Sequence, residues 1–153
     1  MTGPALWLHG LTKVFGAAAA CEDVSLEVSP GEVLGLVGEN GAGKTTVLSL
    51  AFGLYRPTRG QVRAFGRALR PGSPRDAIAA GLGMVHQHFM LVPTLTVAEN
   101  LVLGAEPRRR GLLDRRAAEA AVEAISSRLS LSLDPRARVA DCSVAVQQRV
   151  EVA

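Results

Sequence analysis

Residues 38–45 read Gly-Glu-Asn-Gly-Ala-Gly-Lys-Thr and fit the spaced pattern G-x-x-x-x-G-K-[ST]. The segment just before them, Val33–Val37, is a continuous apolar run of the kind found in a strand covered on both faces. After Lys44, apolar residues recur at helical spacing until Gly53 closes the segment. The sequence therefore predicts a strand, a glycine loop and a helix in direct succession, which is the structural context that the short pattern requires.

The glycines of this loop predict a site for the phosphates of ATP or GTP. Several backbone N–H groups converge on one anion only if the chain bends tightly, and a Cβ would obstruct that bend. A helix that begins beside the loop adds the positive end of its dipole. A glycine turn that carries Lys-Thr by chance is the alternative, and the flanking elements count against it. The residues expected at the nucleotide are Gly38, Glu39, Asn40, Gly41, Ala42, Gly43, Lys44, Thr45 and Thr46.

Within this site the side chains have separate tasks. Lys44 is expected to bridge the β- and γ-phosphates, and the Thr45 hydroxyl is expected to hold Mg²⁺. Thr46 is expected near the α-phosphate.

The rest of the first half predicts a sheet. Alternating apolar residues over 24–28 have the period of a strand with one wet face, and Leu6 and Leu8 begin a similar run, which implies antiparallel pairing. Residues 61–65 and 82–85 predict further short strands, the second of them buried. With the strand and helix around the glycine loop, these patterns favour an α/β fold.

Beyond Pro93 the pattern turns helical. Thr96–Glu99 matches a capping box, in which the threonine hydroxyl accepts a backbone N–H three residues on and the glutamate reaches back. Asp114 is placed to cap a second helix. The apolar residues of that helix form one stripe, consisting of Ala118, Val122, Ile125 and Leu129. The stripe predicts ordinary core packing.

Composition indicates a folded chain with little charge bias. Apolar residues make up 48% of the sequence and charged residues 20%, which excludes a disordered chain. The formal charge of +3 is too small an excess to imply nucleic-acid binding. The basic stretch Arg108–Arg110, with Arg115 and Arg116 beyond it, would meet acidic lipid headgroups or RNA if it formed one patch. A solvated loop and helix start is the favoured alternative.

The sequence gives no sign of membrane targeting. Its N-terminus lacks the basic patch and long apolar run of a secretion signal, and no stretch approaches the roughly 20 apolar residues needed to span a bilayer. We therefore expect a cytoplasmic chain whose membrane role comes through a partner.

Four further segments, in matching order along the chain, resemble the ABC ATPases. Phe15, in Leu11–Gly16, stands where that family places an aromatic ring that stacks on adenine. Gln87 stands at the family's Q-loop glutamine, which reaches the metal and the nucleophilic water. The run over residues 83–104 resembles the ATPases that drive import of nucleosides and simple sugars.

The fourth segment resembles the family's signature. Residues 142–149 read Cys-Ser-Val-Ala-Val-Gln-Gln-Arg. In the family, the serine and the second glycine of this segment cap the γ-phosphate bound to the opposite subunit of a head-to-tail dimer. Ser143 is present, whereas Ala145 replaces that glycine, so a Cβ would intrude where backbone must approach a phosphate. Gln147–Arg149 agree with the family.

The resemblance implies an α/β fold, that of a P-loop NTPase of the ABC type. Its parts would be an N-terminal antiparallel β subdomain, a partial α/β core and a helical subdomain, truncated before the Walker B strand. By this resemblance, residues 1–153 are one incomplete domain. Residues 1–92 would form the β subdomain and P-loop core, residues 93–145 the helical subdomain, and residues 146–153 the start of the signature helix.

The resemblance also implies ATP and Mg²⁺ as cofactors. Lys44 and Gln87 would be catalytic residues. Thr45 and Gln87 would bind the metal ion, and Phe15 and Ser143 would contact the nucleotide. The implied partners are membrane permease subunits and a second ATPase domain, at the inner face of the cell membrane, and nucleic acid is not among them. The leading hypothesis is an ATP-binding subunit that energises import of a small solute, such as a nucleoside or sugar.

Two other hypotheses stay open. Family members continue to a Walker B strand and a catalytic glutamate, and neither precedes Ala153. Hydrolysis requires those carboxylates, so we do not expect turnover, and expect weak stability, from these 153 residues alone. One alternative is a catalytically inactive nucleotide-binding fragment. The other is a soluble ABC ATPase of DNA repair or translation.

Overall fold

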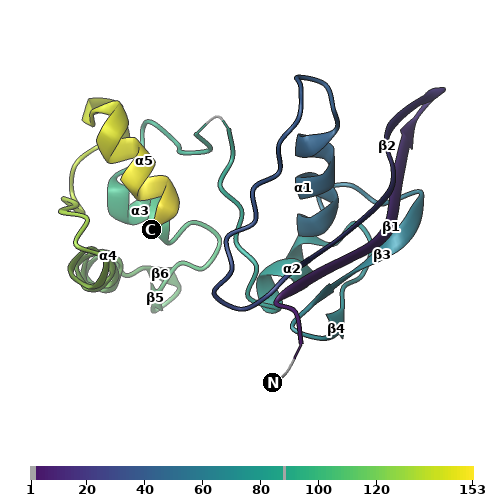
Figure 1. The fold of residues 1–153 in the computed structure, drawn as a ribbon. Coiled ribbons are helices and arrows are strands. Elements are labelled where there is room, and N and C mark those ends of the chain that lie inside the picture. The colour runs from purple at the N-terminus through teal and green to yellow at the C-terminus, as the bar shows by residue number, and fades with distance from the viewer. Residues whose placement is uncertain (1–2, 88) are drawn as a thin grey trace. The chain divides into compact units, whose positions relative to one another are not determined.

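The computed structural model describes residues 3–87 and 89–153 (Figure 1). Contacts divide the chain into two compact units, Met1–Met84 and Val85–Ala153, and each is described by itself. Among the described residues, every helix is too short or too polar to cross a membrane.

The first unit is built on an antiparallel sheet, whose strands within residues 3–87 lie in the order β2-β1-β3-β4. The strands are β1 (Leu6–Phe15), β2 (Ala18–Val28), β3 (Arg59–Ala64) and β4 (Arg67–Ala68). In β1, Leu8 lies opposite Leu26 of β2 on one side and Val62 of β3 on the other. Three apolar side chains are therefore neighbours across the sheet. The antiparallel sheet predicted from the alternating residues is confirmed.

One face of this sheet is covered by α1 (Lys44–Phe52), beside which α2 (Pro74–Ala79) packs (Figure 1). The buried core comprises Leu8, Leu11, Val47, Leu50, Ala51 and Val62. Helix α1 ends at Gly53 as expected, and a Cβ there would lie 2.9 Å from the backbone of Ser73. One apolar residue of α1 is not in the core, because Leu48 is 54% exposed.

The start of α2 is fixed by an ion pair. Two guanidinium nitrogens of Arg70 donate to the two carboxylate oxygens of Asp76, each at 2.8 Å. This hydrogen bonding lowers the pKa of Asp76 to about 2. The Ser73 hydroxyl accepts from the backbone N–H of Asp76 and so caps the helix.

Two of the predicted strands are wrong. Residues 33–37 and 82–85 form no ladder within the described chain, and Val33 and Val37 are 96% and 94% exposed. An apolar run becomes a strand only when a neighbouring strand accepts and donates its backbone hydrogen bonds. The described residues supply no such neighbour to either segment, so an apolar pattern alone was not sufficient.

The second unit is helical. Its elements are α3 (Val97–Leu101), β5 (Arg108–Arg109), β6 (Leu112–Leu113), α4 (Arg115–Leu129), the 3₁₀ helix η1 (Val139–Asp141) and α5 (Val144–Val152). Its core comprises Val97, Ala98, Ala118, Val122, Leu133, Val139 and Val150. The capping box of Thr96 and Glu99 and the cap by Asp114 are both confirmed. Leu129 is 44% exposed, so the buried stripe of α4 ends before it.

Candidate functional site

The glycine loop leads directly into α1, and its last glycine could not be replaced without strain. Gly41 and Gly43 have φ angles of 87° and 85°, a region that side chains rarely adopt. Gly43 is the N-cap of α1. A Cβ on Gly43 would collide with the carbonyl oxygen of Ala20 in β2. The loop is therefore seated against the sheet by a close backbone approach that only glycine permits.

The N-terminus of α1 presents free backbone donors. The first helical hydrogen bond runs from the Val47 N–H to the Gly43 carbonyl, at 2.9 Å. The N–H groups of residues 44–46 therefore have no acceptor inside the helix. Together with the helix dipole they form a positive pole at the loop, which is the chemistry that an anion requires.

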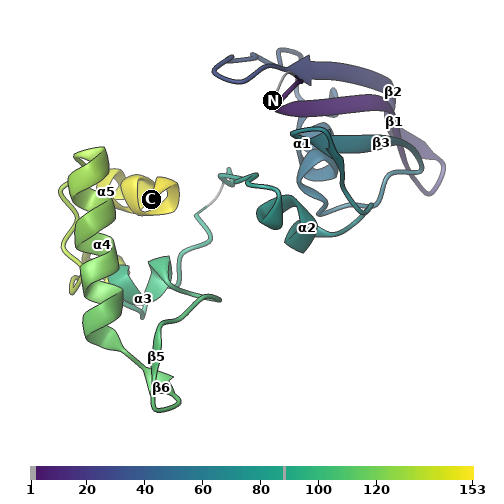
Figure 2. The ribbon, with the colours of Figure 1, turned by 90° about the horizontal axis from the view of Figure 1, so that it is seen from below.

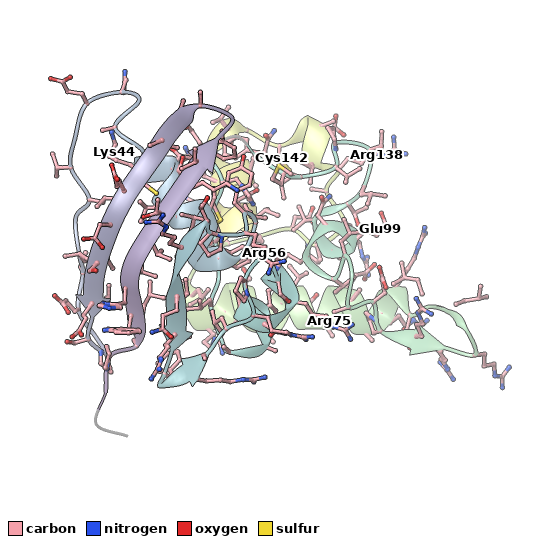
Figure 3. All side chains as sticks on the ribbon, turned by 90° about the vertical axis from the view of Figure 1, so that its right-hand side faces the viewer. Lys44, Arg56, Arg75, Glu99, Arg138 and Cys142 are labelled. Atoms are coloured by element: carbon pink, nitrogen blue, oxygen red, sulfur yellow. The ribbon has the colours of Figure 1, made fainter. Side chains whose placement is uncertain are left out.

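The side chain of Lys44 folds back over the loop (Figure 3). Its Nζ donates to the carbonyl oxygens of Gly38, at 2.6 Å, and Glu39, at 2.7 Å. These two carbonyls hold a full positive charge beside the amides of the helix N-terminus. The residues therefore fit a phosphate group: amides, a helix dipole and an ammonium all lie at one loop.

The loop is open to solvent. Residues 38–42 are exposed, Lys44 and Thr46 are half-buried, and Thr45 is exposed at the second position of the helix. Helix α1 packs on the sheet through Val47 and Leu50, and the Thr45 hydroxyl takes no part in that packing. The donor set fits Mg²⁺ only in part, because Thr45 offers one oxygen ligand. Among the described residues, no group of three or more His, Cys, Asp and Glu is placed to hold a metal.

Phe15 lies at the end of β1 and is 46% exposed. It pairs with Ala18 of β2, two residues from the Ala20 that contacts Gly43, so the ring and the loop share one end of the β1–β2 hairpin. The rings of Phe15 and Tyr55 pack in a T-shaped arrangement with 5.3 Å between their centroids, and Lys13 Nζ lies 4.8 Å from the centre of the Phe15 ring. No sequence pattern indicated Tyr55 as a neighbour of the site; its only signal was an aromatic residue just past the end of α1.

Gln87 and Ser143 belong to the second unit, so the structure does not place them relative to Lys44. Gln87 is exposed in an irregular segment. Ser143 is the N-cap of α5, accepting from the Val146 N–H at 3.4 Å. The Gln147 amide donates to the carbonyls of Val139, at 3.2 Å, and Cys142, at 3.0 Å. These bonds fix the start of α5, where Ala145 is exposed.

Fold and site together define a P-loop nucleotide-binding domain, and comparison with known proteins identifies its family. The family model described as ABC transporter matches residues 21–153. The chain belongs to the ABC transporter family. It resembles, over 97% of its length, a crystal structure of a nucleotide-free ATP-binding cassette from an ABC transporter, with a TM-score of 0.80 and 23% identity, and it covers 63% of that chain.

Curated relatives share more sequence. The chain is 48% identical to the guanosine import ATP-binding protein NupO of Bacillus subtilis, over 93% of this chain and 28% of that protein. It is 47% identical to the ribose import ATP-binding protein RbsA 1 of Rubrobacter xylanophilus, over 98% of this chain and 30% of that protein. The chain therefore spans about 30% of the length of these relatives.

Proposed function

We propose that this chain is the nucleotide-binding part of an ATPase subunit that energises import of a small solute through an ABC transporter. The observation that carries the proposal is the glycine loop with Lys44 held over it at the N-terminus of α1. The two relatives named above are import ATP-binding proteins, one for guanosine and one for ribose. A nucleoside or a simple sugar is therefore the proposed cargo class.

In this proposal, ATP is held by residues 38–46 and by the ring of Phe15. Lys44 neutralises the β- and γ-phosphates. Thr45, with Gln87, holds Mg²⁺, which when bound supplies charge neutralisation at the phosphates. Ser143 donates to the γ-phosphate of a second ATPase domain in a head-to-tail dimer, and a permease places the subunit at the inner face of the cell membrane.

The experiment that tests the proposal compares solute uptake in cells. The gene that contains this sequence, extended to its natural stop codon, is expressed with its neighbouring permease genes. Uptake of radiolabelled guanosine or ribose is then measured with intact protein and with Lys44→Ala. Uptake that depends on Lys44 supports the proposal, because that side chain is needed for phosphate contact. Uptake unchanged by the substitution contradicts it.

A second candidate is a chain that binds nucleotide without turning it over. Ala145 favours this candidate, because it carries an exposed Cβ in the first turn of α5, where the family has glycine. In the uptake experiment, Ala145→Gly separates the two functions. An increase in uptake with glycine means that the alanine restricts an active site, whereas a silent protein with either residue indicates the non-catalytic role.

A further inference from the structure

We propose that the β5–β6 hairpin and the first turn of α4 form a surface that docks on an anionic lipid bilayer. This surface, here called the basic hairpin, comprises residues 106–116. Figure 2 shows β5 and β6 projecting from the helices of the second unit. The proposal does not depend on nucleotide binding, because the hairpin and the glycine loop belong to different units.

The hairpin brings its arginines to an exposed edge. Arg108 lies opposite Leu113 and Arg109 opposite Leu112, with Arg110 and Gly111 in the connecting turn. Arg110 has a φ of 54° and Gly111 a φ of 83°, a tight turn whose first position usually carries Asn, Asp or Gly. An arginine therefore occupies the tip although its backbone conformation is unfavourable, which marks the charge at the tip as a functional candidate.

The basic hairpin carries five arginines against two carboxylates. Glu106 lies 3.6 Å from Arg108, whose side chain is still 70% exposed. Asp114 is engaged as the cap of α4, accepting from the Ala117 N–H at 3.1 Å. Outside the hairpin, Glu99 pairs with Arg115, whose side chain stays 77% exposed. The surface thus remains positive after its ion pairs are counted.

Exposed apolar side chains lie among these charges. Leu112 is 75% exposed, and Leu113 is 36% exposed. An open hollow of about 420 Å³ is lined by four arginines, two leucines and Asp114, so one headgroup would meet several guanidinium groups. Cationic groups beside an exposed leucine match the boundary between anionic headgroups and acyl chains.

RNA is the competing partner, and the hairpin lacks its usual recognition chemistry. Proteins that bind single-stranded RNA stack bases on aromatic side chains. The basic hairpin, residues 106–116, contains no aromatic residue. A lipid surface needs only charge and an apolar side chain, and the hairpin presents both.

Vesicle flotation tests the proposal with the product of the gene that contains this sequence, expressed to its natural stop codon. The protein is mixed with phosphatidylcholine vesicles that contain about one-third phosphatidylserine, or none, and the floated fraction is measured. We expect binding to the anionic vesicles only, weakened by salt. Arg109→Gln with Arg110→Asn should weaken binding about 25-fold, at about fivefold for each arginine removed. Asn tolerates the backbone of the turn, so this variant should keep the hairpin.

Three matched variants complete the test. Arg67→Gln with Arg75→Gln removes the same charge from exposed sites in the first unit and should bind as the unaltered chain does. Arg109→Lys with Arg110→Lys keeps the charge and should also bind. Leu112→Ser should weaken binding at high salt. The proposal is overturned if the Arg67 and Arg75 variant loses vesicle binding as much as the Arg109 and Arg110 variant does. It is also overturned if the unaltered protein does not bind anionic vesicles, or if RNA displaces it from them.

Discussion

Gly43 is the residue on which the geometry of the phosphate loop depends most closely. Its φ of 85° and its approach to the Ala20 carbonyl are separate constraints, one internal to the backbone and one imposed by β2. The first costs a side chain about 1 kcal/mol, and the second requires the loop or the strand to move. Lys44 then loses its fixed position beside the helix N-terminus.

We predict that Gly43→Ala lowers the free energy of unfolding of the first unit by more than about 1 kcal/mol and abolishes nucleotide binding. The control is Gly66→Ala, because Gly66 has a φ of 79° with nothing within 4 Å of the added Cβ. Hydrogen exchange of the α1 amides and binding of a fluorescent ATP analogue measure both effects. If the two alanine variants behave alike, close packing against β2 is not the cause.

At the scale of elements, α4 holds the second unit together through a short apolar face. Val122 is fully buried against the cluster that includes Val97, Val139 and Val150. The N-terminus of the helix is capped by Asp114, and Arg136 ties its first half to the loop before η1 through a 2.9 Å bond to Glu119. Removing buried volume from this face should loosen the whole unit.

We predict that Val122→Ala destabilises the second unit by about 2 kcal/mol, the cost of lost burial and the cavity left behind. Val152→Ala is the matched control, because Val152 is 62% exposed and should change stability little. Hydrogen exchange of the α3 and α4 amides gives the opening free energy of this unit. Equal effects from the two valines would show that the cluster is not the core of the unit.

Local signals in the sequence predicted the elements whose stability is local. The capping box at Thr96, the cap at Asp114 and the stop at Gly53 all depend on residues within one helical turn, and the structure has each of them. The strands expected at 33–37 and 82–85 depend on neighbours elsewhere in the chain, which no local pattern reveals. Helix α1 was predicted, but which of its residues face the sheet was not.

The candidate site also has features that the sequence predicted and features that only the fold shows. The order of the glycines and Lys44 predicted a loop at the start of a helix, and that is what the structure contains. The support of this loop by Ala20, and the contact of Tyr55 with Phe15, arise from the fold of the β1–β2 hairpin. The roles of Gln87 and Ser143 remain predictions, since the two units are described separately.

At the scale of the whole molecule, the chain exposes an apolar segment that a folded protein ordinarily covers. Val33 and Val37 are almost fully exposed, and Leu34 and Leu36 are 45% and 39% exposed. Contiguous apolar surface of this kind promotes association. We predict that the 153-residue chain binds a hydrophobic dye and aggregates, and that Val33→Lys with Val37→Lys reduces both.

Light scattering during heating measures the aggregation, and dye fluorescence measures the exposed apolar surface. The control is Leu48→Lys, which adds charge at an exposed apolar residue of the same unit that lies on α1. A monomeric chain with a cooperative thermal transition and no dye binding would show that residues 33–37 are covered in solution.

The central claim is that amides at the N-terminus of α1 and the ammonium of Lys44 together bind a triphosphate. Isothermal titration of the chain with Mg-ATP tests this claim most directly, with Lys44→Ala and, as a control, Arg67→Ala. We predict saturable binding that weakens at least tenfold in Lys44→Ala, because a charge-assisted contact is lost, and is unchanged in Arg67→Ala. Binding by Lys44→Ala with the affinity of the unaltered chain, or no binding by the unaltered chain, would contradict the claim.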